Sequence, residues 1–516
     1  MNLRRTTGIL ATALLMGFCV SAASAEGTKE KAASAQPIKI ELIQQGWLNV
    51  QNDFAKDPYQ AWIDKTFGVN FTLTSTRDFN NIILVRFASS DHPDMINFNG
   101  NKTLMESVYN QGVLLPDWAP YLSKMPTIDA AFPKEAKLLF TQKGKLVTLS
   151  RQPEMNLWSF KIRKDWLAKL GLQVPTTDKE LLEVGRKITS GDPDGNGKND
   201  TFAFTSSGGG KTLGEIEQLA NMYSPTGFYI GEKGTVEHAI INGSQKKFYD
   251  FMKTVVKEKL IDPDWYTQGW AERKPALFKG MFGVVWYPGV LINEIEGGTG
   301  NTGNSINWWS TINTPVGAPG GGKRASSGVY GTLVSASMMA SKDSVKFNKI
   351  LEILEATSFP NDGFWKLRWG VEIDNFKVSD ITGGFKYIDV LGKPGVHYRG
   401  GNGNMGGWDW GTWLSPGRHD RVVEGTVPTP GVTASAVVAL DTAALALPSY
   451  PIQDRLLNLD AALVQTTNDI KYEFEIKYIL GETDDYQGFV SRWLSAGGQK
   501  LLDAATAQYR ALGMVK

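Results

Sequence analysis

Cysteine is almost absent from this sequence of 516 residues, with Cys19 as its single example. No disulfide can therefore form within the chain, and its stability must come from a large apolar core. Histidine is scarce as well, and none of the four lies in the His-Glu-x-x-His motif of zinc proteases. A Gly-x-Ser-x-Gly nucleophile elbow is also missing. The sequence therefore offers no recognisable zinc-protease or serine-hydrolase centre.

Charge of one sign is not in excess, since 54 Lys and Arg stand against 53 Asp and Glu and the formal net charge is +1. Blocks of basic residues are missing, which argues against a nucleic acid as partner. No repeat of fixed period is found, so neither a solenoid nor a propeller is expected. Beyond the N-terminal segment, no apolar run reaches the ~20 residues needed to cross a bilayer. The exported chain is therefore expected to be soluble.

The N-terminus itself has the order of a secretory signal peptide. Arg4 and Arg5 form a positive start, an apolar run follows from Gly8 to Val20, and Ala23-Ser24-Ala25 supplies the small residues for cleavage. Residues 1–25 are therefore predicted to be removed. Their removal changes the formal net charge of the chain from +1 to −1.

The mature chain is predicted to be periplasmic or secreted after cleavage near Ala25. A lipid anchor on Cys19 is the less favoured alternative, because a lipobox has a small residue before its cysteine and Phe18 is large. Cleavage near Ala25 also removes Cys19, so thiol chemistry is excluded from the mature chain. A polar leader of residues 26–36 precedes the first predicted strand.

Strands and helices alternate in the first part of the mature chain, which predicts a parallel, doubly wound α/β sheet. Such sheets bind ligands beyond the carboxyl ends of their strands. Trp47 and Asn99 follow two of the predicted strands and are expected in loops of that kind. The predicted strands are residues 38–42, 69–73 and 94–98, and the predicted helices are residues 57–67 and 80–88.

A second α/β unit is predicted to begin near Trp158. Thr177 is the expected N-cap of its second helix, because a threonine hydroxyl can accept a bond from the first turn. Glycines between residues 317 and 331 indicate a crossing or surface loop, and the chain from Leu456 is expected to be helical. The first elements of this unit are predicted as a strand at residues 159–162 and helices at residues 164–170 and 178–188.

Five short motifs follow one another along the mature chain. They are Ala88-Ser89-Ser90-Asp91-His92-Pro93-Asp94, the segment from Ile162 to Leu172 followed by Val174-Pro175-Thr176-Thr177, the run from Asp192 to Asp200, Leu260-Ile261-Asp262-Pro263-Asp264, and Ile479-Leu480-Gly481. Each motif alone is weak, and the ordered set is specific. In this order the motifs resemble the extracellular solute-binding proteins of carbohydrate ABC importers, in particular the long-chain branch that includes alginate-oligosaccharide-binding proteins and oligosaccharide-binding lipoproteins.

The resemblance implies a two-lobed α/β fold of the type II periplasmic-binding-protein class, with hinge-connected lobes and a ligand cleft between them. It implies an oligosaccharide as ligand, ABC importer permease subunits as partners, and no enzymatic activity. We expect a monomer. Lobe 1 is predicted to hold residues 37–155 and about 330–390, and lobe 2 residues 156–329 and about 391–516.

The run from Asp192 to Asp200 has the spacing of a calcium loop. Asp192, Asp194 and Asn196 occupy positions one, three and five, the Lys198 carbonyl stands at seven, and Asp200 at nine. Oxygen ligands at alternate positions let a tight loop wrap around Ca²⁺. The glutamate expected at position twelve is missing. We predict one structural calcium ion here, and an Asp/Asn/Gly turn without metal is the alternative.

Tryptophan is the compositional oddity, with 16 residues. Those near Gly, Pro or Asn are predicted to lie in loops, where binding residues concentrate, whereas Trp62, Trp166 and Trp493 look like packed helix residues. Flat aromatic faces stack on sugar rings, and amides bind hydroxyl groups. The predicted sugar-binding residues are Trp286, Trp47, Trp158, Trp408, Trp410, Trp369 and Asn99, with Trp270, Trp308, Trp309 and Trp413 as further loop candidates.

Trp286 ranks first among the stacking candidates. Met281 to Val285 is expected to form a buried strand, and Trp286 to follow it in the loop at its carboxyl end. Packing of Trp286 beneath that loop is the alternative. Two other functions are also considered: a secreted glycoside hydrolase or lyase, which needs only two carboxylates across a cleft, and a carbohydrate sensor on the same scaffold.

Overall fold

The computed structural model describes residues 37–45, 58–76, 78–132, 137, 139–150, 157–299, 302–325, 332–369, 376–381, 385–390, 422–425, 430–451 and 453–516. The predicted signal peptide and leader lie outside these residues, and so do Trp47, Trp408, Trp410 and Trp413. Trp369 is described as the last residue of a helix, by its backbone only.

A five-stranded sheet with the order β2-β1-β3-β13-β6 forms the centre of the first lobe, which we define as the described residues of 38–150 and 332–369. β1 runs parallel to β2 and β3, as predicted, with Leu42 opposite Leu73 and Met95. β13 returns from a distant part of the chain and pairs antiparallel with β3 and β6. The strands are β1 Ile38–Gln45, β2 Val69–Thr76, β3 Met95–Asn97, β6 Leu149–Ser150 and β13 Leu333–Ala336.

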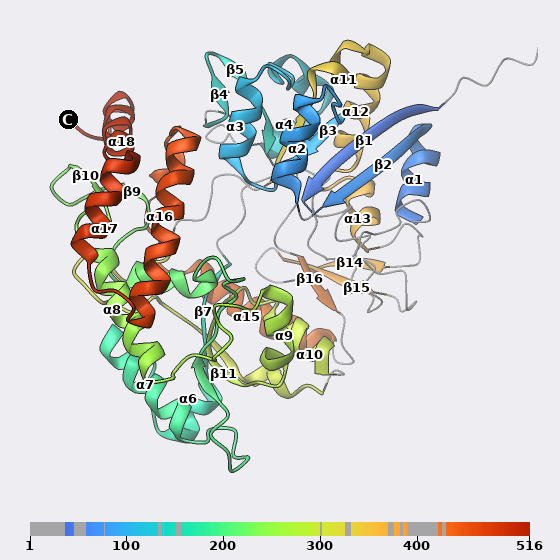
Figure 1. Ribbon diagram of the computed structural model, residues 1–516. Coiled ribbons are helices and arrows are strands. Elements are labelled where there is room, and N and C mark those ends of the chain that lie inside the picture. Colours follow the sequence, from blue (N-terminus) through green and yellow to red (C-terminus); the bar gives the residue numbers. More distant parts are fainter. Residues whose placement is uncertain are drawn as a thin grey trace, which may run out of the picture. The chain divides into compact units, whose positions relative to one another are not determined.

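Helices cover this sheet and close its core (Figure 1). Ile63 of α1, Ile83 of α2 and Ile350 of α12 are fully buried with the strand residues Ile43 and Phe71 in one apolar cluster. The helices of the lobe are α1 Pro58–Phe67, α2 Phe79–Ala88, α3 Lys102–Asn110, α4 Pro126–Ala131, α11 Met338–Lys342, α12 Ser344–Ala356 and α13 Asp362–Trp369, with a 3-10 helix η2 at Ala119–Lys124 and a small hairpin of β4 Thr141–Gln142 and β5 Lys145–Leu146.

The second lobe, the described residues of 157–325 and 430–516, is built on a four-stranded sheet with the order β12-β7-β11-β8. This sheet is mixed. β7 runs antiparallel to both β11 and β12, because chain returning to the sheet enters it in the opposite direction, and β8 is parallel to β11. The strands are β7 Ser159–Arg163, β8 Phe202–Phe204, β11 Phe282–Tyr287 and β12 Trp309–Ile312.

Local sequence signals set the first helices of this lobe as expected. The hydroxyl of Thr177 accepts a bond from the Glu180 amide at 3.2 Å, and the Glu180 carboxylate accepts one back from the Thr177 amide at 3.2 Å, a complete capping box. The helices are α6 Lys164–Leu170, α7 Asp178–Ser190, α8 Ser244–Lys257, α9 Trp270–Phe278 and α10 Leu291–Thr299, with the 3-10 helices η3 Gly214–Met222 and η4 Asn304–Asn307 and a hairpin of β9 Phe228–Ile230 and β10 Val236–His238.

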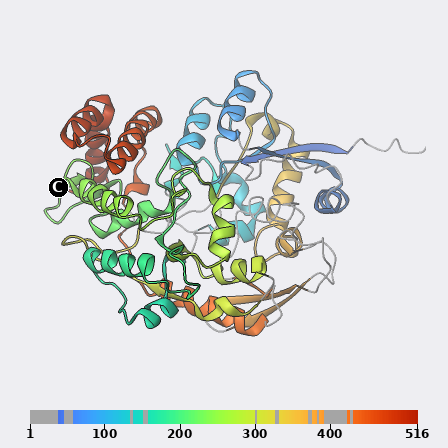
Figure 2. The ribbon, with the colours of Figure 1, turned by 60° about the horizontal axis from the view of Figure 1, so that its bottom comes forward.

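The C-terminal helices complete the second lobe. α16 packs on α8, with Phe474 and Tyr478 buried in the same cluster as Phe248 and Tyr249 (Figure 2). α15 places Val437 in a second, smaller cluster behind β11. These elements are α15 Pro430–Leu445, η6 Asp454–Leu456, α16 Ala461–Leu480, α17 Tyr486–Trp493, the π-helical turn η7 Leu494–Gly498 and α18 Gln499–Ala511.

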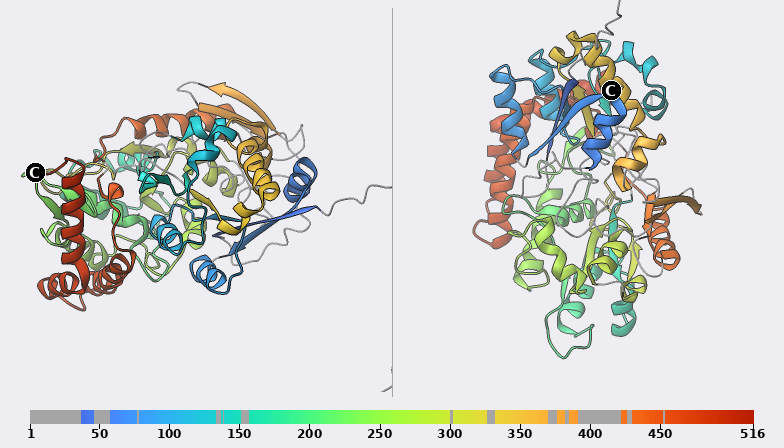
Figure 3. Two further views of the ribbon diagram at one scale, coloured as in Figure 1. Left: turned by 90° about the horizontal axis from the view of Figure 1, so that it is seen from above. Right: turned by 90° about the vertical axis from the view of Figure 1, so that its right-hand side faces the viewer.

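A third sheet has the strand order β14-β15-β16 and lies beside α15 (Figure 3). It consists of β14 Phe376–Ile381, β15 Phe385–Val390 and β16 Val422–Gly425, with β14 and β15 antiparallel and β15 and β16 parallel. The lobe boundary predicted between residues 390 and 391 therefore falls between two paired strands. Among the helices of the described residues, none is both long and apolar enough to cross a membrane.

Candidate functional site

Several strands of the second-lobe sheet begin or end at the same side of the sheet, the carboxyl end of β11, which we call the binding edge. β11 ends at Tyr287, and its partner in β7 at that level is Ser159, the first residue of the strand. Trp158 therefore lies at the same edge as Tyr287. β8 runs parallel to β11, so the turn that begins with Thr205 emerges there too. This is the edge at which α/β sheets place ligands.

Three aromatic rings meet at this edge. The ring centroids of Trp270 and Tyr287 are 4.8 Å apart with an interplanar angle of 24°, so the rings are stacked. Trp158 lies 5.9 Å from Trp270 and 5.7 Å from Tyr287. Tyr287 is buried, whereas both tryptophans are half-buried and keep part of their surface open to solvent. We call Trp158, Trp270 and Tyr287 the aromatic cluster.

A buried arginine packs against the rings of the aromatic cluster. Arg273 is 0 % exposed, and its guanidinium carbon lies 4.5 Å from the Trp270 ring and 5.7 Å from the Tyr287 ring. Its Nη1 donates to Glu215 Oε2 at 3.3 Å. Its Nε and Nη2 atoms are buried without any hydrogen-bond acceptor among the described residues. Three residues after Trp270 on α9, Arg273 shares that helix face because the spacing is one turn.

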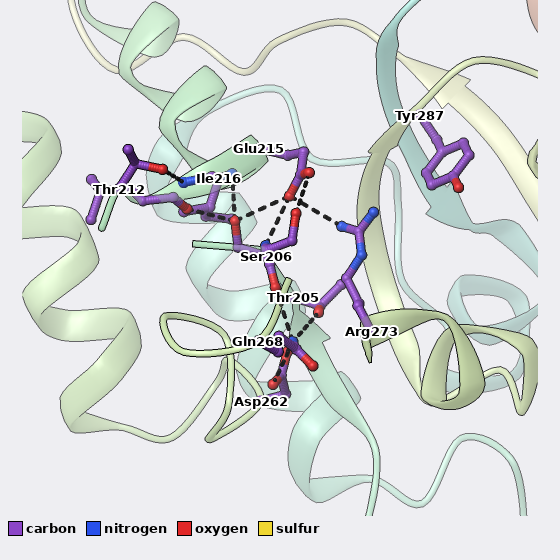
Figure 4. A network of polar contacts seen from close by, with 12 residues as sticks. Thr205, Ser206, Thr212, Glu215, Ile216, Asp262, Gln268, Arg273 and Tyr287 are labelled. Carbon is purple, nitrogen blue, oxygen red and sulfur yellow. Dashed lines mark hydrogen bonds and ion pairs between the residues drawn. The ribbon is translucent and has the colours of Figure 1, made fainter. Parts of the chain in front are cut away.

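Glu215 ties this arginine to the turn that follows β8 (Figure 4). Its carboxylate accepts bonds from the Ser207 amide at 2.9 Å, from the Ser207 hydroxyl, and from the Ser206 hydroxyl at 3.4 Å. Gln268 adds a second connection, donating to the Ser206 carbonyl at 2.9 Å and to Asp262 Oδ1 at 3.1 Å. Burial raises the pKa of the Asp262 carboxyl. The turn and helix α9 are therefore held in one polar network.

The buried carboxylate of Asp441 fixes the turn after β11. Asp441 of α15 is 4 % exposed and accepts a bond from the Gly289 amide at 2.6 Å. A side chain at position 289 would meet the Val437 carbonyl and the Asp441 carboxylate, each within 2.7 Å of its Cβ, so glycine is required there. Lys161 of β7 is fully buried nearby; burial lowers its pKa to about 7 and raises that of Asp441 to about 6, although each attracts the other's charge.

Arg324 is a further buried cation near Trp158. It is 2 % exposed and donates to the carbonyl of Trp158 at 3.1 Å and to that of Leu447 at 3.2 Å. Burial lowers its pKa to about 10. Trp158 is thus held by its backbone, while its side chain joins the aromatic cluster.

The predicted residue Asn99 lies at the corresponding edge of the first lobe. It follows β3 in a left-handed conformation with φ of 45°. Its Nδ2 donates a hydrogen bond of 3.4 Å to Oε1 of Gln45, which is the last residue of β1. Asn101 instead caps α3 by accepting a bond from the Leu104 amide at 3.0 Å. Asn99 is half-buried, so it is placed where a first-lobe contact to a ligand could arise.

Trp286, Trp309 and Trp270 do not lie in loops, and that prediction is wrong; Trp270 is the first residue of helix α9. β11 extends through Tyr287, so Trp286 is a strand residue, paired with Phe160 and in edge-to-face contact with its ring at 4.8 Å. Trp309 begins β12 and is 2 % exposed. Because neighbouring strand residues point to opposite faces, Tyr287 rather than Trp286 joins the aromatic cluster.

Other tryptophans have structural surroundings. The guanidinium carbon of Arg163 lies 4.3 Å from the centroid of the Trp308 ring and 4.0 Å from that of the Trp166 ring. The predictions that Trp166, Trp62 and Trp493 pack against the core are confirmed.

The predicted calcium loop forms a tight turn with converging oxygens. Asp192 accepts bonds from the Asn196 amide at 3.0 Å and the Gly197 amide at 3.0 Å. The Asn196 side-chain amide bridges Asp194 at 2.8 Å and Asp200 at 3.1 Å. Burial, the Asp192 hydrogen bond and the nearby Asp200 charge raise the pKa of Asp194.

The backbone of the calcium loop has the expected sharp turn, since Gly197 has a φ of +77°, which favours glycine. Position twelve is Ala203, which lies in β8 and is buried. Within the described ranges, no three His, Cys, Asp or Glu side chains gather as a metal-binding group. The loop's donors therefore fit a calcium ion only if the Asn196 oxygen and the Lys198 carbonyl take part.

The sequence indicated Trp158 and Trp270 but not the residues that hold them. Arg273, Tyr287, Glu215, Lys161 and Asp441 were not singled out. The position of Arg273 one turn after Trp270 was a signal that a helical reading of residues 270–278 could have used. The partners of Lys161 and Asp441 depend on contacts between distant segments, for which no local signal exists.

Comparison with known proteins identifies a family. Residues 53–346 match the model of the bacterial extracellular solute-binding proteins. The fructooligosaccharide ABC transporter substrate-binding protein FusA of Streptococcus pneumoniae is 26% identical over 249 residues, 42% of this chain and 44% of its own. The polygalacturonan/rhamnogalacturonan-binding protein YtcQ of Bacillus subtilis is 27% identical over 158 residues, 30% of each chain. The chain thus spans less than half the length of these two relatives.

The fold is also found among solved structures. The alginate-binding protein AlgQ2, in a crystal structure without calcium ion, superposes with a TM-score of 0.66 at 18% sequence identity, covering 92% of this chain and 99% of that one. This likeness shows the fold alone. The predicted two-lobed α/β fold of the type II periplasmic-binding-protein class is confirmed.

Proposed function

The chain belongs to the bacterial extracellular solute-binding proteins, and from this premise we propose that it captures an oligosaccharide outside the cytoplasm and delivers it to the permease subunits of an ABC importer. The observation that carries the proposal is the aromatic cluster at the carboxyl end of β11. Two half-buried tryptophans there offer flat apolar faces, and Arg273, which lies against the Trp270 ring, connects them through Glu215 to the polar network of Ser207. Sugar rings need this combination of surfaces.

The relatives' names support binding rather than catalysis: FusA is a substrate-binding protein and YtcQ a binding protein. The carboxylates at the sheet edge are engaged in the network around Arg273 and Gln268. We propose that the chain is not an enzyme. In the same proposal the signal peptide is cleaved near Ala25, the mature protein is periplasmic or secreted and monomeric, and its lobes close on the ligand.

Ligand capture is expected to stabilise the protein against unfolding. A ligand that binds only the folded state adds about 2.7 kcal/mol at a hundredfold excess over its Kd. Differential scanning fluorimetry with neutral and acidic oligosaccharides measures this shift, and chromatography of the same mixtures detects cleavage. Glycan hydrolysis by the purified protein would refute the binding function, as would the absence of any shift with every glycan. Small-angle scattering should show a smaller radius with the ligand that stabilises.

We also propose a structural Ca²⁺ in the loop of Asp192, Asp194, Asn196, the Lys198 carbonyl and Asp200. The Asn196 amide already holds Asp194 and Asp200 together. A divalent cation bound there would balance the charges of these neighbouring carboxylates. AlgQ2, which shares this fold, has a crystal structure without calcium ion, so removal of the metal is a natural test for this chain as well.

Removing calcium is expected to lower the melting temperature without changing which sugar is bound. The reason is that the loop connects α7 and β8 within the second lobe and contains none of the residues of the aromatic cluster. Calorimetry with and without a chelator measures the effect, and elemental analysis counts the metal. Asp194→Asn should abolish the chelator-dependent part. Asp264→Asn, another exposed aspartate of the same lobe, should leave it intact. A melting temperature that the chelator leaves unchanged, with no calcium in the protein, would mean that the loop is only a turn.

A further inference from the structure

Among the described residues, the Nε–H and Nη2–H groups of the buried Arg273 guanidinium have no hydrogen-bond acceptor. Its Nη1 is bonded to Glu215, but Nε and Nη2 lack an acceptor among the described residues, although the side chain is 0 % exposed. A buried donor left unsatisfied loses the hydrogen bonds that water would give it. Such a group in a folded protein calls for an explanation, and a bound ligand is one.

Two other arginines of this protein bind carboxylates through the same two atoms, Nε and Nη2, that have no acceptor in Arg273. Arg163 donates from Nε and Nη2 to the two oxygens of Asp165 at 2.8 and 2.6 Å. Arg186 does the same to Glu258 at 2.6 and 2.9 Å. Two parallel N–H groups match the spacing of two carboxylate oxygens, and the match gives strength and selectivity. The free edge of Arg273 therefore has the geometry of a carboxylate receptor.

The acidic side chains nearest to the aromatic cluster are already engaged. Glu215 accepts the bonds of the turn after β8 and of Nη1. Glu294 accepts a bond from the Tyr287 hydroxyl at 2.7 Å and pairs with Lys274 at 2.8 Å. Lys274 itself lies 5.6 Å from the Trp270 ring. Arg273 and Lys274 are therefore the two cations beside the aromatic cluster, and Glu215 and Glu294 are their paired anions. None of the described carboxylates accepts a bond from Nε or Nη2 of Arg273.

We propose that the ligand is an acidic oligosaccharide and that the carboxylate of one of its uronate rings receives the Nε–H and Nη2–H of Arg273. This inference rests on the proposed oligosaccharide-binding function and names the substrate class of the same site. The uronate ring stacks in the aromatic cluster, and its exocyclic carboxylate reaches the arginine. Arg273 has no accessible surface in the unliganded chain, so the half-buried rings of Trp158 and Trp270 turn aside as the ligand enters.

A neutral sugar does not satisfy this edge in the same way. Two neighbouring hydroxyl groups can each accept one of the two N–H groups, but they bring no negative charge to the buried guanidinium. A carboxylate accepts both and also compensates the buried positive charge. A methyl ester keeps the size of the uronate but removes its charge, so it is the matched probe of the proposal.

The first test uses the unaltered protein and isothermal titration calorimetry. Trimers of galacturonate, mannuronate and guluronate are each compared with their methyl esters and with the neutral trisaccharide 1-kestose. At least one acid trimer is expected to bind, with its ester weaker by about a hundredfold or more. An ester or 1-kestose that binds as tightly as every acid trimer overturns the acidic-ligand inference and leaves the proposed function standing. Binding of none of these glycans overturns both.

The second test exchanges the guanidinium. Arg273→Lys keeps a positive charge but loses the paired edge, and is expected to weaken the acid trimer by about tenfold to a hundredfold while leaving the ester nearly unchanged. Arg186→Lys is the control, since it removes a guanidinium bound to Glu258 on the same lobe. A variant that weakens acid and ester equally shows a general structural role for Arg273 and contradicts the inference. If Arg273→Lys does not fold, the comparison of acid and ester in the unaltered protein decides.

Discussion

Asp441→Asn is expected to lower the free energy of unfolding by up to about 3 kcal/mol at pH 6, the low end of the range for removing one partner of a buried charge pair, because burial raises the pKa of Asp441 to about 6 and about half of this carboxyl is already protonated there. The substitution keeps an oxygen that can accept the Gly289 amide, which now bonds to Asp441 at 2.6 Å. What it removes is the negative charge opposite Lys161, which is fully buried. Lys161 then keeps the Ser159 hydroxyl as a hydrogen-bond acceptor, but it has lost the negative charge that favours its protonated form inside the protein.

The loss should shrink as the pH rises above 7. Burial lowers the pKa of Lys161 to about 7 in the folded protein, below its ordinary value of 10.5. The folded state therefore releases this proton before the unfolded state does, and Lys161 contributes more stability as pH rises from 7 towards 10.5. Once Lys161 is neutral it no longer needs Asp441. Urea unfolding at pH 6 and pH 9 should thus give a clearly smaller loss at pH 9.

Two controls separate this effect from general damage to the core. Lys161→Met combined with Asp441→Asn should recover most of the stability, because replacing both members of a buried ion pair is often neutral or better. Glu352→Gln, which breaks the exposed pair of Glu352 with Lys349, should change stability by about 1 kcal/mol or less. An equal loss at both pH values, or no recovery in the double variant, would show that charge pairing is not the reason.

The elements that could be predicted from the sequence are those set by neighbours in the chain. The alternation of residues 38–42 predicted a strand that the structure extends to Gln45, and the helix at residues 178–188 runs from Asp178 to Ser190. Thr177 and Glu180 are three residues apart, so their capping box is a local signal. Each of these features depends on residues that lie close together in the sequence.

The binding edge could be predicted only in part, because its residues meet through long-range pairing. Strand β7 fixes Trp158 opposite the end of β11, and only that register brings Trp158 to Tyr287. Predicting the strand end at Val285 instead of Tyr287 placed Trp286 in a loop. A strand that continues through both residues alternates their faces, so Trp286 packs against Phe160 and Tyr287 enters the cluster.

Trp286→Ala is accordingly expected to destabilise the unliganded protein and to leave its affinity for sugar unchanged. The ring is half-buried and makes an edge-to-face contact with Phe160 at 4.8 Å within the core of the second lobe. Truncating a buried tryptophan to alanine costs about 3–5 kcal/mol, and the partial exposure of this ring favours the lower end, about 3 kcal/mol. Guanidinium unfolding measures the loss, and calorimetric titration with the stabilising oligosaccharide measures the affinity.

Trp270→Ala is the matched comparison, since the same residue type is removed from the same lobe. Trp270 stacks on Tyr287 at 4.8 Å and keeps part of its surface open, so a stacking surface for sugar is lost. Its removal is expected to weaken binding by about 1–3 kcal/mol, which corresponds to about fivefold to 150-fold in Kd. Part of its packing on Arg273 at 4.5 Å is lost too, so some destabilisation accompanies the weaker binding. The assignment would be reversed if Trp286→Ala abolished binding while Trp270→Ala bound sugar as tightly as the unaltered protein.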